Sequence, residues 1–250
     1  MFTGSLSTSF GVMVMPPKIF PSSPTIENYK ILLGVSSFFA WFKNTVFVVV
    51  SITILSVFVT ATGGYAFAFY EFKGKKILWI ILLAGLMVPR IALIVPLFVV
   101  INRLGLSGTL LAAVLPAIFA PMSLYLARIY FESMPRSILE SSRLDGANEL
   151  QVLIKIVMPV SKPILALCAV FAANGSLGDY IWQMLVLQKE SMQTMVVGLT
   201  RTIMLSGVGR LINLNPVGLP LASGMILLAP LLIIFICANK YFTSAIGGIE

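Results

Sequence analysis

Residues 44–70, NTVFVVVSITILSVFVTATGGYAFAFY, contain no charged side chain and are rich in Val, Ile and Phe. An α-helix rises about 1.5 Å per residue, so a helix of this length crosses a bilayer hydrocarbon core of about 30 Å. The stretch runs into YEFKGKK, residues 70–76, and the three lysines there indicate the cytoplasmic edge of a membrane. It therefore predicts a transmembrane helix whose carboxyl end lies in the cytoplasm.

The composition of the whole chain agrees with this prediction. Of its 250 residues, 58% are hydrophobic and only 10% are charged, whereas a soluble domain carries about a quarter of charged residues. An integral membrane protein is the direct interpretation. The net charge of +8 comes from basic residues spread singly, without a basic face interleaved with aromatics, so a nucleic-acid-binding protein is excluded.

Four further apolar blocks follow, and we expect each to form a span. They are residues 77–101, 104–127, 163–187 and 219–238. The first of them is interrupted by Pro89-Arg90, so we expect it to bend at Pro89 or Pro96 into an interfacial piece. The sequence therefore predicts an all-α fold, a polytopic transmembrane helical bundle of five spans.

Alternation across the bilayer assigns a side to each connection. The 71–76 loop, the 128–162 region and the carboxyl-terminal tail then share the cytoplasmic side. We divide the chain into an external or interfacial segment over 1–43, a transmembrane domain over 44–240 and a cytoplasmic tail over 241–250. The transmembrane domain includes the most polar part of the chain, residues 132–162, which we call the elbow segment.

The elbow segment has the pattern of two short helices. Pro135 suits a first helical turn, and Gly146 is placed to end that helix in a left-handed conformation. A second helix can begin at Ala147 with an apolar stripe, and prolines end it. The stripe comprises Leu150, Leu153 and Val157, and the prolines are Pro159 and Pro163. A solvated loop that only returns the chain is the alternative, but a return needs just two to eight residues, so the pattern favours a docking surface.

The stretch ESSRLDGANELQVLIKIVMPVSKP, residues 140–163, resembles the EAA loop of binding-protein-dependent ABC importer permeases. The residues that fit its spacing are Glu140, Asp145, Gly146, Ala147, Ile156, Pro159 and Pro163. Ser141 and Ser142 replace the two alanines, and Leu153 stands where Phe is common. The resemblance implies that these residues, from Glu140 to Pro159, form a cytoplasmic two-helix coupling segment that sits in a groove of an ATPase subunit.

Further stretches are similar, in order, to permeases of the carbohydrate-uptake, maltose-permease type. They are FPSSPTIENYKILL (20–33), residues 44–76, VPLFVVINRLGLSGTLLAAVLPAI (95–118) and DYIWQMLVL (179–187). The resemblance implies a permease subunit in a bacterial-type cytoplasmic (inner) membrane that moves a sugar or oligosaccharide inward by alternating access. It also implies three partners: a second homologous permease, an ATPase dimer and an extracytoplasmic solute-binding protein.

The chain departs from this family pattern at two places. Permeases of this type usually have another span before PTIENY, residues 24–29, so we expect the first span to be missing or truncated here. Their usual Trp-Asn-Asp-Phe sequence appears as Leu177-Gly178-Asp179-Tyr180. The resemblance therefore does not decide which residues of this stretch contact the substrate.

Polar and aromatic residues of the fourth block are candidates for the substrate path: Asn174, Asp179, Tyr180 and Trp182. Asp179 could accept hydrogen bonds from sugar hydroxyls, or it could hold a neighbouring span. The aromatic rings could stack on a pyranose, or they could belong to an interfacial belt. Arg90 has a similar pair of interpretations, a functional charge or a side chain that snorkels outward.

Several classes of protein and site are disfavoured by what the sequence lacks. It has no histidine, no Gly-rich phosphate loop and no spaced carboxylate pair within a span. We therefore expect no catalytic residues, no metal site and no cofactor, with ATP bound and hydrolysed by partner subunits. A permease for another polar solute, such as a glycerol phosphate, remains the main alternative. A secondary transporter or channel would be expected to show inverted repeats or several charges at membrane depth.

Overall fold

The computed structural model describes residues 1–8, 20, 23–205 and 215–246, and its regular elements there are helices. Two units can be distinguished by packing. The first unit comprises Met1–Val48, Leu104–Ala113 and Leu177–Ile233, and the second comprises Val49–Arg103, Val114–Ser176 and Ile234–Glu250. These units reflect packing rather than position in a bilayer, so our division at residues 43 and 240 stays a prediction.

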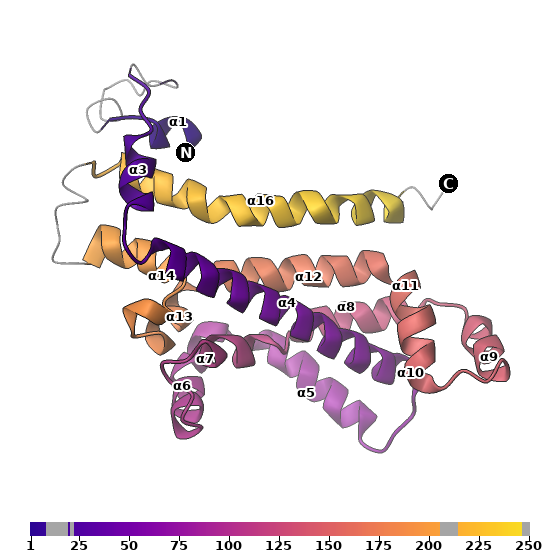
Figure 1. The fold of residues 1–250 in the computed structure, drawn as a ribbon. Helices are drawn as coiled ribbons and strands as arrows, with labels where there is room; N and C mark the ends of the chain where they lie inside the picture. Colours follow the sequence, from indigo (N-terminus) through magenta and orange to yellow (C-terminus); the bar gives the residue numbers. More distant parts are fainter. Residues whose placement is uncertain (9–19, 21–22, 206–214, 247–250) are drawn as a thin grey trace. The chain divides into compact units, whose positions relative to one another are not determined.

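Among the described residues, two helices are long and apolar enough to cross a membrane alone: α4 (Phe38–Phe69) and α16 (Gly218–Ile246), the latter over Gly218–Ile236. They are drawn in indigo and yellow in Figure 1. α4 begins six residues before the predicted Asn44 and includes Lys43, whose exposed side chain can reach water from the first turns of the helix. α16 continues through Ile246 and so includes most of the predicted tail. Residues 247–250 lie outside the described residues.

Three bent helix pairs supply the remaining candidate spans, which makes five in the described residues if each pair counts once. The first pair is α5 (Lys75–Met87) with η1 (Arg90–Leu93) and α6 (Ile94–Arg103), bent by 104°. The second is α7 (Leu110–Val114) and η2 (Leu115–Ala117) with α8 (Pro121–Glu132), bent by 41°. The third is α10 (Glu149–Val152), η3 (Leu153–Val157) and α11 (Met158–Val160) with α12 (Lys162–Leu177), bent by 84°. Four of the five predicted spans thus have counterparts in these helices, and the fifth, over residues 163–187, is matched by α12 only as far as Leu177.

Proline chemistry explains the first bend. Val88 is extended, with ψ 118°, because a residue that precedes proline is pushed out of the helical region. Pro96, the alternative bend position, lies in the first turn of α6, where proline costs no hydrogen bond. The helix therefore breaks at Pro89 and not at Pro96.

The fourth apolar block, residues 163–187, does not form one helix. α12 ends at Leu177, and α13 (Tyr180–Val186) begins after Gly178 and Asp179. α13 is followed in the first unit by η4 (Glu190–Met192), α14 (Met195–Thr200) and η5 (Arg201–Leu205). Of the third bent pair, only α12 therefore belongs to the predicted span. The part before the bend, from α10 to α11, belongs to the elbow segment.

The first unit is built around buried residues of α3 (Glu27–Leu33), α4, α14 and α16. The indole Nε1 of Trp41 donates to the carbonyl of Glu190 at 3.0 Å. The amide of Asn44 donates to the carbonyls of Ser191 and Gln193, each at 2.9 Å. These bonds satisfy backbone groups that would otherwise be buried without partners, and they hold the η4 loop on the first turns of α4.

The second unit has a core that joins α4, α8 and the elbow segment. Its buried members are Ala61, Tyr65, Ala68, Ala127, Phe131, Leu139, Val152, Leu153, Val157 and Leu165. Gly64 of α4 lies against α8: a Cβ at this position would be 3.0 Å from the Cβ of Ala127 and 3.4 Å from the backbone nitrogen of Arg128. The absence of a side chain at Gly64 thus permits close approach of the two helices.

We expect Gly64→Leu to destabilise the second unit by about 1–3 kcal/mol, because the added side chain forces α4 and α8 apart. The quantity to measure is the midpoint of thermal unfolding of the detergent-solubilised protein. Gly63→Ala is the matched control. Its Cβ would meet only the side chain of Leu124, with Cδ1 at 2.8 Å and Cγ at 3.6 Å, and that side chain can change rotamer. Equal midpoints for Gly64→Leu and wild type would show that the helices are not in close contact.

Candidate functional site

The elbow segment begins with α9 (Arg136–Leu144), which ends at the predicted glycine. Gly146 has φ +84°. Its N–H donates to the carbonyl of Arg143 at 3.0 Å, and the N–H of Ala147 donates to the carbonyl of Ser142 at 3.1 Å. These two bonds form a Schellman motif, in which the left-handed residue satisfies the last carbonyls of a helix. The structure thus places Gly146 in the left-handed turn that its sequence position indicates.

The second helix of the elbow segment, α10, begins at Glu149 rather than at Ala147. Asn148 occupies the N-cap position, and a capping box fixes this start. The N–H of Gln151 donates to Oδ1 of Asn148 at 2.9 Å, and the N–H of Asn148 donates to Oε1 of Gln151 at 3.0 Å. Our prediction of a start at Ala147 was wrong by two residues, because the Asn-x-x-Gln cap decides where the helix begins.

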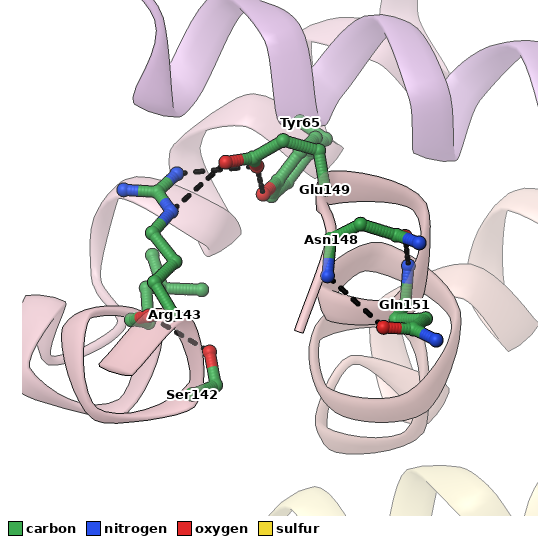
Figure 2. A network of polar contacts seen from close by, with 7 residues as sticks. Tyr65, Ser142, Arg143, Asn148, Glu149 and Gln151 are labelled. Atoms are coloured by element: carbon green, nitrogen blue, oxygen red, sulfur yellow. Dashed lines mark hydrogen bonds and ion pairs between the residues drawn. The ribbon is translucent and has the colours of Figure 1, made fainter. Parts of the chain in front are cut away.

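The carboxylate of Glu149 joins three elements, as Figure 2 shows. The hydroxyl of Tyr65, on α4, donates to Oε2 of Glu149 at 2.7 Å. Arg143, in the last turn of α9, pairs with the same carboxylate through Nε at 3.0 Å and Nη2 at 3.2 Å. One side chain therefore connects α9, α10 and α4.

These donors also set the protonation state of Glu149, which lies outside the spans. Hydrogen bonds from Tyr70 and Tyr65, together with Arg143, lower the pKa of the Glu149 carboxyl to about 2. The carboxylate is thus ionised at every physiological pH, and its hydrogen bonds are charge-assisted. Sequence reasoning assigned no role to Glu149, Arg143 or Tyr65.

The residues of the EAA-like pattern divide between two sides of the elbow segment. Glu140, Ser141, Asp145 and Pro159 are exposed. Ser142 and Leu153 are buried, and Ala147 and Ile156 are half-buried. The pattern thus supplies both an outer surface and the contacts that hold it on the core.

Large apolar side chains are also exposed on the outer side of the elbow segment. Leu144 is 88% exposed and Leu150 is 61% exposed, and Ile138 and Ile154 are exposed as well. Our assignment of Leu150 to the inward stripe was therefore wrong, and Val152 takes its place. Exposed apolar groups outside a span, among polar neighbours, are typical of a protein–protein contact surface.

The prolines act differently from the prediction. Pro159 does not end the helix but lies in its α11 part, which ends at Val160 and is followed by the 84° bend before α12. In a regular α-helix the ring of Pro159 would clash with the carbonyl of Lys155. Lys155 lies in η3, a turn of π-helix, and this wider turn accommodates the proline. Pro163 lies in the first turn of α12, where its missing N–H costs nothing.

The candidate substrate-path residues belong to different units. Asn174, on α12 of the second unit, is exposed, while Asp179 and Tyr180 of the first unit are half-buried. Trp182, also in the first unit, is buried, and its indole Nε1 donates to the carbonyl of Ala112 at 3.0 Å. In this conformation the Trp182 ring packs inside its unit and presents no open face to a sugar. A substrate path through these residues stays a prediction.

No three potential metal ligands among His, Cys, Asp and Glu come together in the part of the chain that the structure describes. The sulfhydryl of Cys168 is buried and donates to the carbonyl of Ser123 at 3.7 Å, which is the packing role expected for a cysteine in an apolar block.

Comparison with known proteins agrees with this geometry. The family described as "Binding-protein-dependent transport system inner membrane component" matches residues 60–247. The arabinooligosaccharides transport system permease protein AraQ of Halalkalibacterium halodurans is 31% identical over 92% of this chain and 81% of its own length. The maltodextrin transport system permease protein MdxG of Bacillus subtilis is 30% identical over 92% of this chain and 82% of its own length.

Among solved structures, a bacterial ABC transporter involved in the import of the acidic polysaccharide alginate superposes with a TM-score of 0.83. It is 26% identical in sequence, and the match covers 96% of this chain and 88% of that chain. The fold and the family predicted from the EAA-like pattern are thereby confirmed, as is a location in the inner membrane with several spans. The chain belongs to the family of inner membrane components of binding-protein-dependent transport systems.

Proposed function

We propose that this chain is the membrane-spanning permease subunit of an ATP-driven importer that moves a sugar or oligosaccharide into the cell. The family membership and the named relatives support this proposal. The observation that carries it is the elbow segment, whose outer side exposes Leu144 and Leu150 while its inner side is part of the second-unit core. Such a segment can receive force on one side and pass it to the spans on the other.

The mechanism is alternating access. ATP binding closes a pair of ATPase subunits, the elbow segment moves with the subunit on which it docks, and the spans open outward to accept solute from an extracytoplasmic binding protein. A second, homologous permease completes the path. In this scheme the chain has no catalytic residue of its own, and ATP is bound and hydrolysed by the partners.

The test is reconstitution in vesicles with the ATPase, the second permease and the solute-binding protein. We expect uptake of labelled maltotriose or arabinotriose that needs ATP and the binding protein and is insensitive to ionophores. Uptake that follows an ion gradient without ATP would instead indicate a secondary transporter. Uptake of glycerol phosphate, with neither sugar transported, would support the alternative solute class.

A further inference from the structure

The carboxylate of Glu149 accepts hydrogen bonds from α9, through Arg143, and from α4, through Tyr65. These two helices must move together if a movement of the elbow segment is to reach the spans. We propose that the Glu149 carboxylate, held by Tyr65 and Arg143, is the joint through which movement of the elbow segment reaches α4. This inference rests on the proposed function. It makes Glu149, Tyr65 and Arg143 positioning residues, which act on transport by holding helices and not by touching solute or nucleotide.

The α4 side of this joint is rigid. Tyr65 is only 5% exposed and belongs to the core that includes Phe131, Val152 and Leu153. Its ring also makes edge contacts with those of Phe69 and Tyr70, at centroid distances of 5.3 Å and 5.7 Å. Packing therefore fixes the hydroxyl, and a displacement of its acceptor must either move α4 or break the 2.7 Å bond.

The elbow side is equally constrained. Glu149 is the first residue of α10, and the Asn148–Gln151 capping box holds the backbone there. The two bonds from Arg143 fix the angle between α9 and α10, because a guanidinium that pairs through two nitrogens constrains orientation as well as distance. Apart from these two bonds, α9 is held by the turn at Gly146 and by the packing of the buried Leu139 in the core of the second unit.

A carboxylate suits this role better than a neutral side chain. It accepts several hydrogen bonds at once and offers no proton of its own, so the donors from α4 and α9 can meet at one acceptor. In this conformation the tyrosine hydroxyls, more than Arg143, lower the pKa of the Glu149 carboxyl, so it is an ionised acceptor at physiological pH.

The experiment uses the complete importer in vesicles and measures sugar imported per ATP hydrolysed, with maltotriose or arabinotriose as the probe. We expect Glu149→Gln to lower this ratio about tenfold and Tyr65→Phe about threefold, since the first change takes the charge out of every bond to the Glu149 carboxylate and the second removes one of these bonds. Both variants should assemble at wild-type yield. Joining Arg143→Glu to Glu149→Arg should raise the ratio above that of either single reversal.

Two matched controls remove a carboxylate and a tyrosine hydroxyl at other places in the second unit. Glu71→Gln removes an exposed carboxylate that pairs with Lys75, and Tyr125→Phe removes a hydroxyl from a ring that stacks on Trp79. Neither should change the ratio. If hydrolysis and uptake fall in proportion in Glu149→Gln and Tyr65→Phe, or if both keep the wild-type ratio, the joint does not exist. If Glu149→Gln assembles poorly, Tyr65→Phe decides, because it removes one oxygen and leaves the ring in the core.

A second readout needs no identified sugar, namely the rise in ATP hydrolysis when the solute-binding protein is added. We expect wild type to respond and Glu149→Gln to keep its basal rate but lose most of the response. A wild-type complex that imports neither probe contradicts only the proposed substrate class, and the hydrolysis response still tests the joint. An unchanged response in Glu149→Gln contradicts the joint, whatever the substrate is.

Discussion

Replacing Gly146 with Asp is expected to lower ATP-driven uptake by about two orders of magnitude, while the chain remains inserted in the membrane. Two effects add. Gly146 has φ +84°, where a Cβ costs about 1–2 kcal/mol. No atom lies within 4 Å of the position that the Cβ would take, so the new carboxylate would meet no group of this chain there, and under the proposed function it would enter the contact with the ATPase. A charge left unpaired in such a contact costs several kcal/mol.

Gly74→Asp is the matched control for this prediction. Gly74 has φ +86° and equally open surroundings, so the strain is the same, but it lies before α5 and outside the elbow segment. We measure uptake into vesicles alongside co-purification of the ATPase. Loss of both in Gly146→Asp, with near-normal values in Gly74→Asp, is the expected result. Wild-type uptake by Gly146→Asp would contradict the docking role of the turn.

Gly198→Ala is expected to destabilise the first unit by roughly 3–5 kcal/mol, from overpacking together with a lost hydrogen bond. An added Cβ would overlap the six-membered ring of Trp41, with three ring atoms closer than 3.0 Å. Trp41 is 1% exposed, and its Nε1 bonds to the carbonyl of Glu190. The ring therefore has no space to move into unless it gives up that bond.

The thermal midpoint in detergent, with the yield of monodisperse protein, measures this effect. Gly85→Ala is the control, because no atom lies within 4 Å of its added Cβ in α5, and its midpoint should stay close to that of wild type. Joining Trp41→Leu to Gly198→Ala should cost less than the sum of the two single changes, since the ring that causes the clash is gone. Strict additivity of the two changes would mean that Gly198 and Trp41 do not touch.

Much of the fold was predictable because the signals are local. Uncharged runs such as 44–70 give the spans, Pro89 gives a bend, and Gly146 gives the end of a helix. The family also follows from local spacing in residues 140–163. In each case the physical cause, whether hydrophobic length, a fixed proline φ or a glycine with positive φ, acts within a few residues of the pattern.

The misses have a common cause, which is that contacts between distant residues leave no local pattern. Tyr65 and Glu149 are 84 residues apart in the sequence. The predicted stripe was right at Leu153 and Val157 and wrong at Leu150, which is exposed while Val152 is buried. Packing against distant residues such as Tyr65 and Phe131 decides which residues of α10 are buried, and spacing within the segment does not contain that information. Trp182 likewise looked available from its sequence, but the carbonyl of Ala112 holds its indole.

The wide turn over Leu153–Val157 has one more consequence. It holds one residue more than an α-turn, and if it tightened, the rest of this helix, as far as Val160, would rotate by about 100° and shift by about 1.5 Å along the helix axis. The hydroxyl of Ser161, which lies just beyond, is buried without a hydrogen-bond partner in the described residues and is thus free to find one after such a slip. The wide turn therefore lies just ahead of the 84° bend before α12, at a place where a helix can gain or lose one residue without being broken.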